Sequence, residues 1–373
     1  MGSRDTSCGT DLECKWKSVA SSLFSFAPRT PRGVAVLDSK TGAGFVILAA
    51  MANASFALPM KWMPRWSWEN IWSVWSVCSL LVFPFLAAFY TVPALAVGYH
   101  EVAAPVIARV VFYGFAWGIA QVLFGLSVER IGMALTFSIV LGSSAAIGTL
   151  LPFIRLHSEL LFTAAGGFIV AGVVFVACGM VLCALAGFRR ENEARTTPDS
   201  QRSGPFRTGL IIASVSGLCA SFMNIGISFA APLLEMAAKH GTKPYWSLNA
   251  VWLPLLVGGA VPNLAYCVYL FIKRRSLADF AQSGTSSYWL FCALMSVLWF
   301  GSSLTYGLAS YYLGSMGPIV GWPVFMSLIV ICASVLGWIS GEWRTSTRRP
   351  LQLHVAGIAM LVLALFLLSR VNA

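Results

Sequence analysis

Ten apolar windows constrain the fold of this chain more than any other feature of its sequence. A helix crosses the hydrocarbon core of a bilayer in about 20 apolar residues. Lipid offers the backbone no hydrogen-bond partners, so only helices satisfy lipid-facing segments of this kind. The sequence therefore predicts an all-α integral membrane protein with ten transmembrane helices, at about residues 41–60, 70–92, 106–127, 131–154, 160–187, 208–231, 247–272, 287–309, 317–340 and 352–369.

The composition supports a membrane location and argues against nucleic acid as a partner. The chain is 58% hydrophobic and 10% charged, whereas a soluble domain carries about 25% charged residues. The net charge of +11 comes from basic residues, and most of them lie in short loops between the apolar windows. Positive loops of this kind are retained on the cytoplasmic side of a membrane. We therefore expect the lipid bilayer, not nucleic acid, to be the main partner.

The basic residues also predict the orientation. The loops that follow the odd-numbered windows hold fourteen of them, namely Lys61, Arg65, Arg130, Arg189, Arg190, Arg195, Arg202, Arg207, Lys273, Arg274, Arg275, Arg344, Arg348 and Arg349. The opposite side holds five, namely Arg109, Arg155, Lys239, Lys243 and Arg370. The positive-inside rule then places the odd loops in the cytoplasm and both termini outside. We therefore expect a multi-pass protein of the cell inner membrane with periplasmic termini.

Four segments follow from this pattern. Residues 1–40 form a tail without the apolar core of a signal peptide, which we interpret as disordered or as a start-site artefact. The tail holds six more basic residues, which weaken the charge asymmetry when they are counted. Residues 41–187 and 208–373 each contain five windows. The polar stretch 188–207 is the expected cytoplasmic linker between these two halves.

A repeated pattern relates the two halves. Residues 117–132 read WGIAQVLFGLSVERIG and residues 299–314 read WFGSSLTYGLASYYLG, so that Trp117 matches Trp299 and Gly132 matches Gly314. A weaker match relates the Ala-Ser-Phe triplets at 54–56 and 220–222. Both matches imply a unit of five helices, and an odd number of spans inverts the second copy. Inverted repeats are typical of secondary transporters, whose substrate site lies between the halves.

The sequence holds none of the common motifs for catalysis or ATP use. It has no GxxxxGK[ST] loop, GxGxxG fingerprint, GxSxG elbow, HExxH pair or CxxC pair. His100, His157, His240 and His354 are scattered near the ends of windows. We therefore expect no enzyme activity, no cofactor and no metal site. Uphill transport would have to draw on an ion gradient.

Polar and aromatic side chains inside the windows are the candidate substrate contacts. An amide in hydrocarbon needs a partner, so it faces another helix or a hydrated cavity. For any single residue, a contact between helices is an equally good interpretation. As a set, Trp faces with uncharged amides and hydroxyls suit a neutral sugar. The candidates are Asn53, Trp117, Gln121, Asn224, Asn249, Trp299, Tyr306 and Trp322.

Three carboxylates are candidates for proton coupling. Glu69 opens the second window, where the helix macrodipole favours an acid. Glu235 follows the sixth window and Glu342 ends the ninth. None lies at the middle of a window, so a solvated position among the lipid headgroups is the alternative interpretation for each.

Five segments resemble the L-rhamnose–proton symporter family of the drug/metabolite transporter superfamily. They are WSWENIWSV at 66–74, WGIAQVLFGLSVERIGM at 117–133, GLCASFMNIGISFAAPLLEMAA at 217–238, GGAVPNLAYC at 258–267 and GEWRTSTRRP at 341–350. The resemblance runs from about residue 41 to the C-terminus. It implies ten helices, a central cavity between two halves, and uptake of a neutral deoxy-sugar together with a proton.

The chain departs from the family pattern at two places. It has Gln121 and Leu123 where the family has two Asn, and its residues 317–322 read GPIVGW, without the acidic stretch of the family. Our hypothesis is a secondary transporter that takes up L-rhamnose with a proton by alternating access. The alternatives are a drug/metabolite-type permease or exporter for another small metabolite, an integral-membrane enzyme, and a sensor derived from a carrier.

Overall fold

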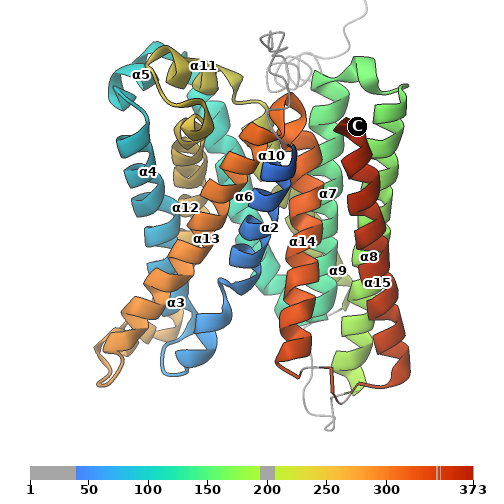
Figure 1. The fold of residues 1–373 in the computed structure, drawn as a ribbon. Coiled ribbons are helices and arrows are strands. Elements are labelled where there is room, and N and C mark those ends of the chain that lie inside the picture. Colours follow the sequence, from blue (N-terminus) through green and yellow to red (C-terminus); the bar gives the residue numbers. More distant parts are fainter. Residues whose placement is uncertain (1–38, 194–205, 342, 345, 373) are drawn as a thin grey trace, which may run out of the picture.

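The computed structural model describes residues 39–193, 206–341, 343–344 and 346–372, and every regular element in these ranges is helical. Ten helical segments within the described ranges are long and apolar enough to cross a membrane. The prediction of ten transmembrane helices is therefore confirmed. Figure 1 shows the segments side by side in one bundle, with the C-terminus at the same end as α5 and α11.

Each half of the chain contributes five spans. The first half contains α2 (Ser39–Ser55), α3 (Trp68–Ser76), α4 (Phe83–Thr91), α5 (Leu95–Glu101), α6 (Ala104–Ile131), α7 (Met133–Leu156) and α8 (Ala164–Glu193). The second half contains α9 (Phe206–Ala220), α10 (Phe222–Ser228), α11 (Ala231–Lys239), α12 (Asn249–Arg274), α13 (Ser286–Tyr312), α14 (Gly317–Ile339) and α15 (Arg348–Ser369). The second span runs through α3, a π-helical segment (Val77–Val82) and α4, and the sixth runs through α9, α10 and α11.

The sixth span extends beyond its predicted window, 208–231, to Lys239. Pro232 lies in the first turn of α11, where its missing N–H and its ring interrupt the helical ladder least. The chain turns there without leaving the membrane-spanning segment. The predicted apolar window ends at residue 231 because Glu235 and Lys239 lower the apolar content of the residues that follow.

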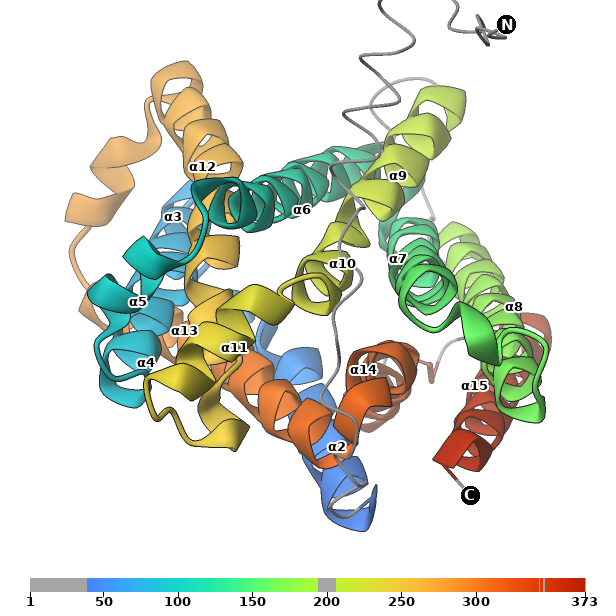
Figure 2. The ribbon, with the colours of Figure 1, turned by 90° about the horizontal axis from the view of Figure 1, so that it is seen from above.

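The helices of the two halves pack reciprocally. Helix α2, the first of its half, contacts α13 and α14, the third and fourth spans of the other half. Helix α9 begins the second half and contacts α6 and α7, the third and fourth spans of the first half. The two fifth spans, α8 and α15, pair with each other at one side of the bundle (Figure 2). This is the pairing that an inverted duplication would produce.

Helices α6 and α12 approach so closely that glycine is required between them. A Cβ atom built on Gly114 would lie 1.7 Å from the Leu255 carbonyl oxygen, and one on Gly258 would lie 2.1 Å from the Val111 carbonyl oxygen. Gly118, one turn after Gly114, faces Gly259 in the same way. Small residues spaced by four let membrane helices pack backbone against backbone. This contact fixes the position of the middle of α6, where Trp117 lies.

Candidate functional site

Four indole rings meet at the middle of the membrane-spanning bundle. Trp117 and Trp299 lie near the midpoints of α6 and α13, and their ring centroids are 5.6 Å apart. Trp75 packs edge-on against Trp299 at 5.2 Å, and Trp72 lies 4.3 Å from Trp75. We call Trp72, Trp75, Trp117 and Trp299 the tryptophan cluster. It joins the second and third spans of the first half to the third span of the second half.

Amides border the tryptophan cluster on two sides. The Trp72 indole N–H donates to Asn263 Oδ1 at 3.0 Å, and Asn263 Nδ2 donates to the Gly259 carbonyl at 2.9 Å. Asn53 Nδ2 donates to Ser302 Oγ at 3.3 Å. Asn53 is a predicted contact residue, whereas Trp75 and Asn263 are absent from the predicted set. Trp72 and Trp75, three residues apart, are neighbours on one helix face, which is the signal that points to Trp75.

A second polar group lies toward the end of α13, where Tyr306 follows Trp299 by about two helical turns. Asn224 is fully buried, and its Nδ2 donates to the Gly148 carbonyl at 2.8 Å and to the Pro318 carbonyl at 2.9 Å. The Tyr306 hydroxyl donates to Asn224 Oδ1 at 3.5 Å. Trp322 packs edge-on against Tyr306 at 5.5 Å. We call Asn224, Tyr306 and Trp322 the asparagine group.

The asparagine group ties α10 to α7 and α14. The Trp322 indole N–H donates to the Ser144 carbonyl at 3.2 Å, which links α14 directly to α7. A buried amide is satisfied here entirely by backbone carbonyls and one phenol. In this conformation Asn224 therefore holds helices together, and it would contact a substrate only after α7 and α14 separate.

Two predicted contact residues lie apart from these groups. Gln121 follows Trp117 by one turn of α6 and is half-buried. Asn249 is the first residue of α12 and donates to Thr91 Oγ1 at 2.9 Å. It precedes Gly259, which touches Trp117, by ten residues, or roughly 15 Å along the helix. The structure thus brings Trp117 and Trp299 together and places Asn249 toward the membrane surface.

The three candidate carboxylates have different environments. Glu69 is fully buried, which rules out a solvated headgroup position for it in this conformation. Its Oε2 lies 3.1 Å from Arg274 Nη1, and the Ser276 hydroxyl donates to its Oε1 at 2.5 Å. Glu235 is exposed. Glu342 lies outside the described residues.

Further bonds around Glu69 lock the start of α3 to the segment after α12. The Ser67 backbone N–H and hydroxyl donate to Asp279 Oδ2 at 3.2 and 2.6 Å. Asn70 Nδ2 donates to the Ser276 carbonyl at 3.1 Å. These contacts join the two segments at the membrane end that the loop charges assign to the cytoplasm.

The tryptophan cluster is closed in this conformation. Trp117 is 5% exposed and Trp299 is 7% exposed, so little of either ring is accessible. Each ring offers an apolar face of the kind that packs against the C–H groups of a sugar. A ligand would reach these faces when the two halves of the protein separate.

Comparison with known proteins identifies similar chains. The family model described as "L-rhamnose-proton symport protein" matches residues 40–371. A protein of Mannheimia succiniciproducens named L-rhamnose-proton symporter is 26% identical over 85% of this chain and 93% of its own length. Its namesake from Cronobacter sakazakii is 28% identical over the same shares of the two chains. The match thus covers the ten spans and the linker but not the first 39 residues.

Proposed function

Because this chain belongs to the L-rhamnose–proton symport protein family, we propose that it carries L-rhamnose and a proton together across the membrane by alternating access. The observation that carries this function is the family match over residues 40–371. This family consists of sugar–proton symporters, so the function is transport rather than enzyme catalysis. The further placement in the drug/metabolite transporter superfamily, the location in the inner membrane and the periplasmic termini are part of the same proposal.

The proposed substrate site is the tryptophan cluster with its bordering amides. Trp117 and Trp299 come from opposite halves, as expected for a site between inverted repeats. L-rhamnose is neutral, with a methyl group and C–H faces for the indoles and hydroxyls for amides. Two predicted amides lie near these rings. Gln121 follows Trp117 by one turn of α6, and Asn53 donates to Ser302, three residues after Trp299. Asn224 would join them from the asparagine group when α7 and α14 move.

The proposed proton site is Glu69. A symporter needs an acid whose protonation favours one conformation over the other. Glu69 is buried against Arg274 and Ser276, so it holds the cytoplasmic ends of the second and seventh spans together. A proton on Glu69 would remove the charge that binds Arg274 and would favour opening on that side. Glu235, which is exposed, fits this role less well.

Uptake of labelled L-rhamnose into proteoliposomes tests the proposal. We expect uptake that rises when the outside is acidified and that collapses with a protonophore. The Glu69→Gln variant should still exchange L-rhamnose across the membrane but should lose its response to the pH gradient. No L-rhamnose flux under either condition would refute the substrate, and flux indifferent to the gradient in the unaltered protein would refute proton coupling.

A matched pair of variants tests the substrate site. Trp299→Ala should reduce uptake at least tenfold, because a lost stacking contact and the surrounding rearrangement each weaken binding. Trp289→Ala serves as the control, since Trp289 lies on the same helix and is half exposed at the membrane end. Normal uptake by Trp299→Ala would exclude the tryptophan cluster as the substrate site.

A further inference from the structure

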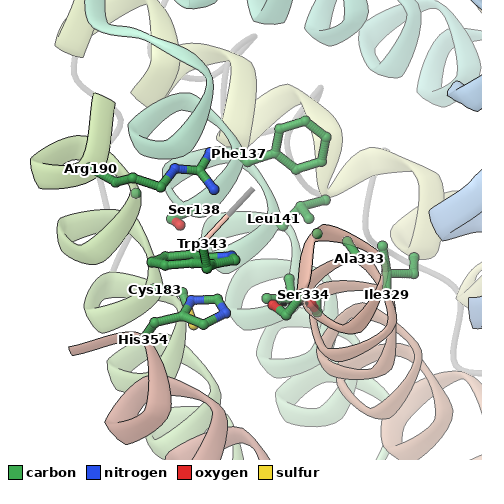
Figure 3. A pocket seen from close by; sticks show the side chains of 13 residues that line it. Phe137, Ser138, Leu141, Cys183, Arg190, Ile329, Ala333, Ser334, Trp343 and His354 are labelled. Atoms are coloured by element: carbon green, nitrogen blue, oxygen red, sulfur yellow. Dashed lines mark hydrogen bonds between the residues drawn. The ribbon is translucent and has the colours of Figure 1, made fainter. Parts of the chain in front are cut away.

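A cavity of about 260 Å³ lies at the cytoplasmic end of the bundle, among α7, α8, α14 and α15. It contains no residue of the tryptophan cluster or the asparagine group. Its lining combines one cation, Arg190, with the rings of Trp343 and His354 and with apolar side chains such as Leu141 and Ile329 (Figure 3). The described residues that line it include no acid.

Three of these side chains form a stack on one wall. The Trp343 ring lies parallel to the His354 ring with centroids 4.1 Å apart, and the Arg190 guanidinium carbon lies 4.7 Å from the Trp343 centroid. Figure 3 shows Arg190 and His354 on opposite faces of Trp343. Both faces of the indole are therefore covered. A sugar ring cannot stack there, so this cavity is not a second site of the kind proposed for L-rhamnose.

His354 is the unusual member of the stack. It is 95% buried, since only 5% of its surface is exposed, and neither ring nitrogen has a hydrogen-bond partner among the described residues. A buried polar group without a partner costs free energy. Ionisable residues inside membrane spans are rare and commonly mark functional sites. The His354 ring borders the cavity, so a small rotation of the ring would bring a covered nitrogen to a ligand there and provide the missing partner.

The chemistry of the lining selects the ligand. Arg190 contributes only hydrogen-bond donors, and His354 contributes a donor on at least one nitrogen. The Ser334 hydroxyl already donates to the Val330 carbonyl at 2.7 Å, so it has no hydrogen left to donate to a ligand. A group rich in acceptor oxygens and carrying negative charge matches these donors. The apolar wall formed by Leu141 and Ile329 matches a hydrocarbon portion beside that group.

The surroundings attract the same kind of ligand. Arg344, Arg348 and Arg349 lie at this end of the bundle, close to the start of α15. Basic pockets between helices on the cytoplasmic side commonly bind the head groups of anionic lipids. We propose that this cavity binds a phosphate-bearing amphiphile, whose phosphate oxygens accept hydrogen bonds from Arg190 and His354 and whose apolar part packs on α7 and α14.

Lipid binding to the purified full chain tests this proposal. The protein is placed in phosphatidylcholine nanodiscs, and dioleoyl phosphatidylglycerol is titrated while bound lipid is counted by native mass spectrometry. We expect Arg190→Gln to weaken phosphatidylglycerol binding on the order of tenfold, because it removes a charge-assisted hydrogen bond. The matched control is Arg189→Gln, which makes the same charge change at an exposed neighbour outside the cavity. It should bind the lipid like the unaltered protein.

A second variant separates the ligand contact from folding. His354→Phe keeps an aromatic ring against Trp343 but removes both nitrogens, so the stack should form and binding should still fall by several-fold. In a parallel arm, inorganic phosphate is added in phosphatidylcholine alone and the melting temperature is followed. Stabilisation by phosphate that is lost in His354→Phe would assign the site to a soluble phosphate compound, whereas selective loss of phosphatidylglycerol would assign it to a lipid.

The opposite result is equally definite. The proposal would be overturned by two results together. Phosphatidylglycerol would bind equally to the unaltered protein and to all three variants, Arg190→Gln, His354→Phe and Arg189→Gln, and phosphate would leave the melting temperature unchanged. The melting temperatures of the four proteins in phosphatidylcholine verify that each variant is folded.

Discussion

The glycine contact between α6 and α12 gives the sharpest stability prediction. In Gly114→Ala the new Cβ would lie 1.7 Å from the Leu255 carbonyl oxygen, 2.6 Å from its carbonyl carbon and 3.1 Å from its Cα. All three atoms belong to the backbone, so no side chain can rotate away. Ordinary contact begins at about 3.4 Å. The two helices would have to separate locally by roughly 1.7 Å to accept one methyl group.

The energetic cost follows from that displacement. Overpacking a well-packed interior costs about 1–3 kcal/mol, and here the separation also loosens the adjacent contacts of Gly118 and Gly258, which depend on the same close approach. We therefore expect a loss of at least about 3 kcal/mol. That corresponds to a fall in melting temperature of roughly 6 °C or more. Because Trp117 lies between the two glycines of α6 that make this contact, L-rhamnose uptake should fall as well.

Gly125→Ala is the matched control on the same helix. A Cβ atom at Gly125 meets nothing within 4 Å, and alanine is the better helix former by about 1 kcal/mol. Its melting temperature should equal or slightly exceed that of the unaltered protein. Both variants are measured by intrinsic fluorescence during heating in the same detergent. If Gly114→Ala melts within about 1 °C of Gly125→Ala, the close approach of α6 and α12 is wrong.

Three further predictions concern polar contacts. Glu69→Gln leaves Arg274 without its anionic partner and should lower the melting temperature by a few degrees, consistent with about 1–2 kcal/mol for a charged hydrogen bond to a half-exposed partner. The same loss in Arg274→Gln would support the pair, and no loss in either would refute it. Asn224→Ala removes bonds to two carbonyls and should lower L-rhamnose uptake at least fivefold, by about 1 kcal/mol or more; unchanged uptake would exclude a role for this amide. Outside the spans, a hydrogen bond from Lys239 and then one from His240 hold the pKa of the Glu101 carboxyl below its ordinary value, so its contribution to stability is present above the unfolded pKa and is lost as pH falls through the folded pKa. Melting curves of the unaltered protein and Glu101→Gln should therefore differ at neutral pH and converge in acid, and a gap that widens in acid would contradict this sign.

Some features of the fold follow directly from sequence. The ten spans are predicted because each window supplies about the apolar length that a bilayer requires. The repeat selects Trp117 and Trp299 as candidates for one site, since equivalent residues near the middle of their spans lie close to the midplane in inverted copies. These predictions depend on composition and spacing alone. They need no knowledge of which helices touch.

Other features depend on contacts between distant parts of the chain. Glu69 is buried because Arg274 and Ser276, more than 200 residues later, enclose it; its position at the start of a window indicates only an interfacial acid. Arg190 reaches the Trp343 and His354 rings because α8 packs on α15, and no spacing rule predicts that stack. The roles of Asn53, Gln121 and Asn249 as substrate contacts stay predictions, because only binding or uptake measurements can test them.

The contact between Trp117 and Trp299 bears on how such a carrier would work. Equivalent residues of two inverted copies can touch only if they lie close to the axis that relates the copies. In inverted copies, a ring pair at the midpoints of α6 and α13 would lie on that axis and be equally distant from both membrane surfaces. A rocking motion about the axis would then uncover the pair from one side or the other without moving it far. On this reasoning the Trp117–Trp299 pair should be the point about which the two halves move. Glu69 lies toward one surface and the asparagine group toward the other. The contacts of these two sites should therefore open in turn.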